Sequence, residues 1–195
     1  MSIREQWKNL HTLLSLDSGE KNRALLMFLY NFLLLNTLYL LKPVRDSLFL
    51  EQAGAQNLPF VFILTALAVI PVSIGYSRIS QQYSVRWIIN LITLFLAGNL
   101  FTVWFFIEMN SDVLYYAFYI WVSIYSVLIT SQFWLFANTI YNAVQAKKVF
   151  GFLSLGAIMG AAVGGELTGI LINVFDVAST SLLLVSGLIL LSTIP

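Results

Sequence analysis

Hydrophobic positions dominate the chain and form long runs that short polar stretches interrupt. The runs cover about residues 22–50, 58–77, 85–107, 114–143, 148–174 and 178–195. About 20 apolar residues at a rise of 1.5 Å span the hydrocarbon core of a bilayer, so runs of this length are typical of membrane-spanning helices. The pattern therefore predicts one six-helix transmembrane domain over residues 21–195.

Residues 1–20 follow a different pattern. Ile3, Trp7, Leu10 and Leu14 recur at helical spacing, with charged residues between them. This amphipathic pattern predicts a cytoplasmic helix that lies in the plane of the membrane interface. The alternative is an ordinary flanking helix without a membrane-binding role.

Composition agrees with an all-α integral membrane protein whose main partner is the lipid bilayer. The chain is 59% hydrophobic and 10% charged, with a mean hydropathy of +0.84, whereas soluble domains carry about 25% charged residues. Cysteine is absent, which excludes disulfides and thiolate metal sites. A net charge of +1 gives no reason to expect nucleic acid as a partner. Neither a metal-ligand cluster nor a cofactor motif is present in the sequence.

Three charged residues, Lys42, Arg45 and Asp46, interrupt the first apolar run. A charge at bilayer depth costs about 2.5–3.5 kcal/mol even on an insertion scale, so such residues usually face a cavity and mark a solute path. Lys42 and Asp46, four residues apart, are placed to pair along the helix. Pro43 predicts a kink beside them. The alternative is that the helix ends near Leu41 and that the charges lie in the headgroup zone.

The fourth and fifth runs add further candidate residues. Asn138 and Asn142 share one helical face and either contact a solute or hydrogen-bond to neighbouring helices. Gly156, Gly160 and Gly164 repeat every four residues, a spacing that lets helix backbones approach closely. This stripe indicates either tight static packing or a sliding surface between moving helices.

Glu166 lies in the fifth run at nearly the depth of Lys42 and Arg45, about 27 Å from Lys148 by helical rise. It is therefore the expected countercharge for Arg45 and is expected to balance charge in an empty site. The alternative is a purely structural ion pair. The sequence predicts no enzyme, because the single histidine lies outside the predicted spans and no catalytic pair occurs within them.

Lysine and arginine gather on one side of the six predicted spans. With the N-terminus inside, eight of the ten basic residues lie on the inner side: Arg4, Lys8, Lys21, Arg23, Arg78, Arg86, Lys147 and Lys148. Cytoplasmic loops carry an excess of lysine and arginine. Both termini are therefore expected in the cytoplasm.

Two segments carry a resemblance to a known family. The first runs from Leu41 through Lys42-Pro43-Val44-Arg45-Asp46-Ser47 to Leu58-Pro59-Phe60. The second contains Gln132-Phe133-Trp134, Ala137-Asn138 and Gln145-Ala146-Lys147-Lys148-Val149-Phe150-Gly151, followed by the glycine run. Together these segments, which cover most of residues 40–170, resemble the bacterial and plastid-type ATP/ADP translocases. The chain has Arg45-Asp46 where those exchangers have Lys-Asp, and amides where an acidic residue is expected in the fourth helix.

The resemblance implies the N-terminal half of a transporter of the major-facilitator type, located in a bacterial inner membrane. Six-helix halves of such carriers consist of two inverted three-helix repeats, and a second half is the expected partner. The expected function is exchange of an anionic, nucleotide-type solute such as ATP or ADP. Lys42, Arg45, Asp46, Asn138 and Asn142 are the expected solute contacts. The alternatives are a carrier of another solute and a membrane scaffold or sensor.

Overall fold

The described part of the protein is a bundle of helices. The computed structural model describes residues 18–106, 112–175 and 178–194 and contains no strand among them. The elements are α2 (Ser18–Gln52), η1 (Ala55–Asn57), α3 (Leu58–Gln82), α4 (Val85–Phe106), α5 (Asp112–Ile140), α6 (Ala143–Asn173) and α7 (Ser181–Leu191). The all-α expectation is confirmed. The amphipathic helix expected over residues 1–20 falls almost entirely outside the described residues.

Five of these helices are long and apolar enough to cross a membrane, namely α2, α3, α4, α5 and α6. The sixth, α7, has 11 residues, so its length of about 16 Å is half the hydrocarbon thickness of about 30 Å. The six expected helices are therefore present. The last one is shorter than the run of apolar residues from 178 to 195 indicated.

The first helix continues through the charged residues. α2 has 35 residues and includes Pro43 in its interior, so the alternative of a helix that ends near Leu41 is wrong. It ends in a turn at which Gly54 has a φ of 80°, a conformation that residues with a Cβ rarely adopt. Pro59 lies in the first turn of α3, where its missing N–H costs nothing because that group has no partner within the helix.

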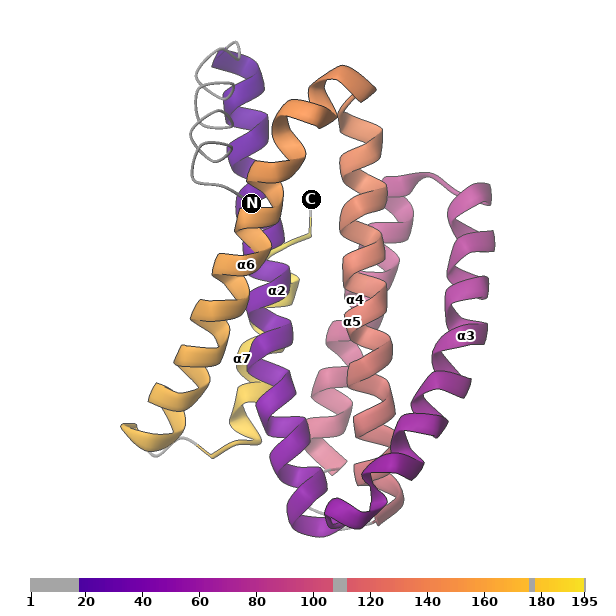
Figure 1. Cartoon of the computed structure of the whole chain (residues 1–195), viewed down its shortest axis with the longest axis vertical. Coiled ribbons are helices and arrows are strands. Elements are labelled where there is room, and N and C mark those ends of the chain that lie inside the picture. Colours follow the sequence, from indigo (N-terminus) through magenta and orange to yellow (C-terminus); the bar gives the residue numbers. More distant parts are fainter. Residues whose placement is uncertain (1–17, 107–111, 176–177, 195) are drawn as a thin grey trace.

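The helices form two layers (Figure 1). α6, α2, α5 and α3 lie side by side in the layer nearer the viewer, and α4 and α7 lie behind α5 and α2. The most extensive contacts join α2–α6, α2–α5, α4–α7, α3–α5, α2–α7 and α4–α5, and α3 also touches α4. Exchanging α2 with α5, α3 with α6 and α4 with α7 maps the six extensive contacts onto one another. Corresponding helices of the two three-helix units run in opposite directions (Figure 1), and no repeat is visible in the sequence.

The contact between α2 and α6 is the closest in the bundle and uses the glycine stripe. A Cβ added to Gly156 or Gly164 would lie 2.6 Å from a main-chain carbonyl oxygen of α2, and one added to Gly160 would overlap the carbonyl of Phe32. The Asn31 amide also donates a hydrogen bond of 2.9 Å to the Leu153 carbonyl of α6. Close contact and a buried polar link favour static packing over a sliding surface.

Replacing Gly160 by alanine should destabilise the bundle by about 1–3 kcal/mol, because the backbones must move apart to admit the methyl group. Gly98→Ala on α4 is the matched control. A Cβ there meets nothing within 4 Å, and alanine is the better helix former by about 1 kcal/mol. Denaturation of the purified protein in detergent measures both changes. Equal stability of Gly160→Ala and wild type would contradict the close contact.

Candidate functional site

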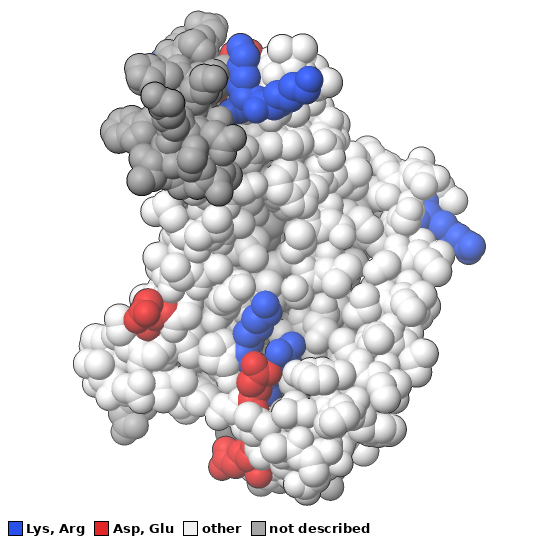
Figure 2. Space-filling model, viewed as in Figure 1, with Lys and Arg blue, Asp and Glu red and all other residues white. Residues whose placement is uncertain are grey.

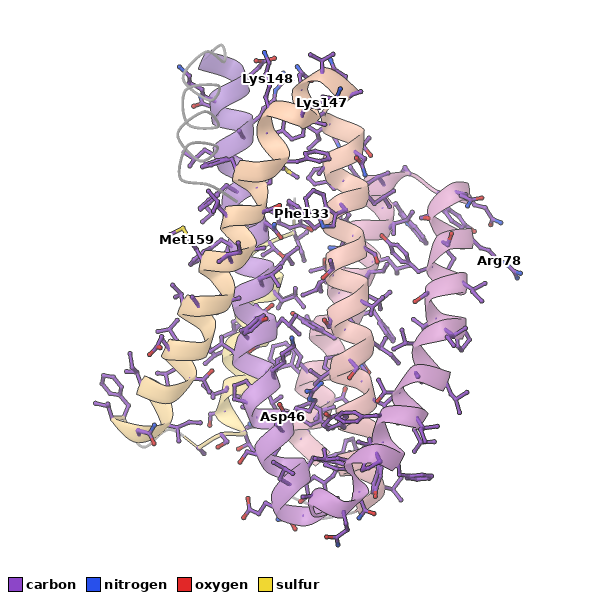
Figure 3. The ribbon with its side chains drawn as sticks, in the orientation of Figure 1. Asp46, Arg78, Phe133, Lys147, Lys148 and Met159 are labelled. Atoms are coloured by element: carbon purple, nitrogen blue, oxygen red, sulfur yellow. The ribbon has the colours of Figure 1, made fainter. Side chains whose placement is uncertain are left out.

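The three charged residues of α2 lie together on the face formed by the nearer layer of helices. Figure 2 shows basic and acidic side chains in the lower middle of this face, surrounded by uncharged atoms, and Figure 3 labels Asp46 there on α2. Lys42 and Asp46 share one side of the helix because they are four residues apart. We call Lys42, Arg45 and Asp46 the charge cluster.

Arg45 is held by contacts on several sides. Its Nη2 lies 2.7 Å from Asp46 Oδ1, and its Nε donates to the same oxygen at 2.9 Å. Nη1 donates to the Ser123 hydroxyl of α5 at 3.2 Å, and the guanidinium carbon lies 4.1 Å from the centre of the Tyr119 ring. The Arg45 side chain is therefore only 13% exposed, whereas that of Asp46 is 48% exposed. Arginine suits this position because its planar cation can bind a carboxylate and stack on a ring at once.

Lys42 has a different environment. Its Nζ lies 4.5 Å from the centre of the Tyr39 ring, and no carboxylate of a described residue lies within 4.0 Å of it. The expected Lys42–Asp46 pair is therefore wrong. Asp46 instead forms its ion pair with the adjacent Arg45. An ammonium group has three donors and no acceptor, so Lys42 presents donors on this face that no carboxylate of a described residue neutralises.

Glu166 does not pair with Arg45. It is exposed on α6 and makes no ion pair with another described residue. The physical reason is that α6 turns its glycines, not Glu166, toward α2. By helical rise, Arg45 and Glu166 were expected at similar depth. The Glu166 side chain, however, lies on a side of α6 that does not face α2.

The two asparagines lie at the opposite end of α5 from the charge cluster. Asn138 is exposed and 15 positions beyond Ser123, so about 22 Å away along the helix. Asn142 is the N-cap of α6: its side chain accepts from the backbone N–H groups of Val144 and Gln145, and Gln145 completes a capping box. The structure therefore does not bring these amides together with Lys42 and Arg45. Asn142 has a structural role that its spacing did not reveal.

The N-terminus of α2 lies beside the turn between α5 and α6. Gln145 Nε2 donates to Glu20 Oε1 at 2.7 Å. Burial raises the pKa of Tyr141 in this turn, while the charge of Arg23 opposes the shift and that of Glu20 adds to it. Lys147, Lys148 and Arg78 lie toward this end of the bundle (Figure 3).

A buried polar network joins α2, α4 and α5 between the two ends. Gln132, which is fully buried, donates to the Tyr30 hydroxyl at 2.9 Å and to Thr93 Oγ1 at 3.1 Å. Thr37 and Tyr125 share a hydrogen bond of 2.6 Å. Such links between helices average about 0.6 kcal/mol each in a membrane, so they specify which faces meet more than they stabilise the bundle.

A hollow of about 620 Å³ lies away from the charge cluster. It is lined by α2 from Arg23 to Leu33, by Phe136 and Ile140 of α5, and by the residues just after α7, Ser192 and Thr193. Its wall is mostly apolar and contains none of the three charge-cluster residues. The charged side chains and the hollow therefore lie in different places. We assign the candidate site to the charge cluster, because charges within a membrane-length helix are costly and usually have a function.

Tyr39, Tyr119 and Ser123 contact the charge cluster and were not predicted as site residues from the sequence. A tyrosine near a membrane interface is common and carries no signal by itself. Tyr119 and Ser123 are four residues apart and so share a face of α5, which is the one sequence feature that identifies them. No family model, curated protein or solved structure matches this chain.

A double-mutant cycle tests the pairing of Arg45. Arg45→Ala and Asp46→Ala should be coupled by at least about 0.5 kcal/mol, because the two side chains are in direct contact. Arg45→Ala and Glu166→Ala are the matched pair and should be additive. Free energies of unfolding of the single and double variants give both values. Coupling of Arg45 to Glu166 rather than to Asp46 would contradict the geometry described above.

Proposed function

We propose that this chain forms one half of a membrane transporter that binds an anionic solute and moves it by alternating access. The observation that carries the proposal is the charge cluster, which lies inside a membrane-length helix on the face of the nearer layer. Intramembrane charges are costly and usually mark a solute or ion path. Two cations and one carboxylate leave the cluster with a net charge of +1, which attracts an anion and repels a cation.

The helix arrangement supports the same proposal. Inverted three-helix repeats are a feature of secondary transporters, whose solute sites lie near the bilayer midplane between repeats or halves. The charge cluster lies on an open face, so a second six-helix half would be needed to enclose it. That half comes either from the same polypeptide or from another subunit.

The three charged residues have distinct proposed roles. Lys42 contacts the anion, because its ammonium donors are not bound to a carboxylate. Arg45 is oriented by Tyr119 and Ser123, and Asp46 holds it while the site is empty. Asn138 and Asn142 have no part in this site, because they lie about 22 Å or more from it along α5.

A phosphorylated solute of the ATP or ADP type is the proposed cargo. Lysine and arginine are the side chains that bind phosphate best, lysine as a point charge and arginine as a planar fork. The resemblance of the two segments described above supports a nucleotide, and the replacement of lysine by Arg45 permits a different anion.

Both termini are proposed to lie in the cytoplasm of a bacterial cell, with the protein in the inner membrane. Lys21, Arg78 and Lys148 lie toward one end of the bundle, and Glu51 lies at the end of α2 that is opposite Lys21. This asymmetry follows the positive-inside rule.

Cysteine labelling tests this orientation. With an impermeant maleimide added to intact cells, Gln56→Cys between α2 and α3 should react, and Ser80→Cys near the end of α3 should react only after the cells are permeabilised. The two sites form a matched pair because a single helix separates them. The reverse pattern would contradict the proposed orientation.

Uptake of labelled ATP and ADP into vesicles that contain the full-length protein tests the function. Lys42→Gln should lower kcat/KM for uptake by tenfold or more, because a hydrogen bond to a charged group contributes about 1.5–3 kcal/mol. Lys148→Gln, a lysine at the far end of the bundle, is the control and should transport normally. A folded protein that takes up neither nucleotide, even with counter-substrate inside the vesicles, would contradict a nucleotide carrier. Normal uptake by Lys42→Gln would remove Lys42 from the site.

A further inference from the structure

The hollow between α2 and α5 lies beside the end of α7. Its lining includes Ser192 and Thr193, the residues just after α7, and no residue of α7 itself. Leu26 and Leu29 of α2, which also line it, are 67% and 48% exposed. With a volume of about 620 Å³, the hollow falls in the range of about 300–1,000 Å³ that is typical of ligand sites.

The wall of the hollow carries charge at one place only. Arg23 is the one charged side chain among the described residues that line it. The hydroxyls of Ser192 and Thr193 donate to main-chain carbonyls of α7, so neither adds a free donor to the wall. Apolar cavities stay dry, and a dissolved ion gains nothing from an apolar wall. An occupant that fits this wall is therefore apolar over most of its length.

The hollow extends over about one leaflet of a bilayer. Along α2 its lining runs from Arg23 to Leu33, a rise of about 15 Å. This is half of the hydrocarbon thickness of about 30 Å. Arg23 directly follows the polar start of α2, residues 18–22, and directly precedes an uncharged run that extends to Leu41. It therefore lies where lipid headgroups meet the hydrocarbon core.

The Arg23 side chain is available to an anion. It is exposed, and no carboxylate of a described residue lies within 4.0 Å of it. Glu20, about one turn earlier on α2, accepts a hydrogen bond from Gln145 instead. Arginine binds phosphate through two parallel N–H donors, and basic pockets between transmembrane helices bind the headgroups of anionic lipids.

We propose that this hollow binds an anionic phospholipid, with its phosphate at Arg23 and one acyl chain along the wall between Leu26 and Leu33. The acyl chain fills the apolar space, and the guanidinium selects lipids of net negative charge over zwitterionic ones. Because α2 and α5 both line the hollow, the bound lipid stabilises their packing at this end of the bundle. The bilayer supplies the ligand, so the site does not depend on the proposed transport.

Native mass spectrometry of the delipidated full-length protein in detergent measures the binding. Phosphatidylglycerol should bind more tightly than phosphatidylcholine, and Arg23→Gln should lower the affinity for phosphatidylglycerol by about tenfold or more, because a hydrogen bond to a charged group is lost. Arg86→Gln on α4 is the matched control, since Arg86 is exposed and does not line the hollow, and it should bind as wild type does. Equal affinity for both lipids, or equal losses in the two variants, would overturn the proposal.

A larger side chain tests where the acyl chain lies. Leu29→Trp should lower the affinity for phosphatidylglycerol to that for phosphatidylcholine, because the indole takes the space of the acyl chain. Leu91→Trp on α4 is the matched control and should change neither affinity, since Leu91 is 47% exposed and lies outside the hollow. An unchanged affinity in Leu29→Trp would place the acyl chain elsewhere and contradict the proposal.

A photo-crosslink identifies the occupant in native membranes. With p-benzoylphenylalanine in place of Phe136, which lines the hollow, irradiation of the full-length protein should give phospholipid adducts. These should be richer in anionic lipid than adducts formed from Phe95, an exposed residue of α4, and Arg23→Gln should remove the difference. An adduct to a segment of polypeptide instead of lipid, or equal lipid composition at the two positions, would show that the hollow is not an anionic lipid site.

Discussion

The close packing of α2 on α6 is the contact on which the rest of the structure depends. Three glycines of α6 lie against main-chain carbonyls one turn apart on α2, and the Asn31 side-chain amide of α2 donates to the Leu153 carbonyl of α6. Without a hydrophobic driving force between helices in lipid, such association relies on close van der Waals contact and on polar links. The contact sets how α2 is rotated in the bundle and therefore which of its residues face α5.

That rotation determines the chemistry of the charge cluster. With its glycine-facing side against α6, α2 turns Arg45 toward Tyr119 and Ser123 of α5 and leaves Lys42 on the open face beside Tyr39. Asp46 then binds the arginine to which it is adjacent. Of these two cations, Arg45 is held by protein groups, and Lys42 has no carboxylate of a described residue within 4.0 Å. Under the proposed function, an anion would therefore meet Lys42 without first breaking the Arg45–Asp46 ion pair.

Features that follow from the regular geometry of a helix were predicted correctly from the sequence. Runs of apolar residues indicated all six helices, and the four-residue repeat of glycines indicated a close helix contact, because both follow from helix geometry and the apolar solvent alone. The length of α7 and the start of α6 were less accurate, since a cap such as Asn142 ends one helix and begins the next within an apolar run.

Pairings between side chains were decided by the tertiary structure. Rise along a helix placed Arg45 and Glu166 at similar depth, but rotation about the helix axis, set by the glycine contact, turned Glu166 to the opposite side of α6. The sequence by itself determined that the chain is an all-α membrane protein with charged residues within its first long helix, because composition and periodicity depend only on the solvent and the helical repeat. Only the folded bundle decided which partner each charge meets, because that depends on how two helices rotate against each other.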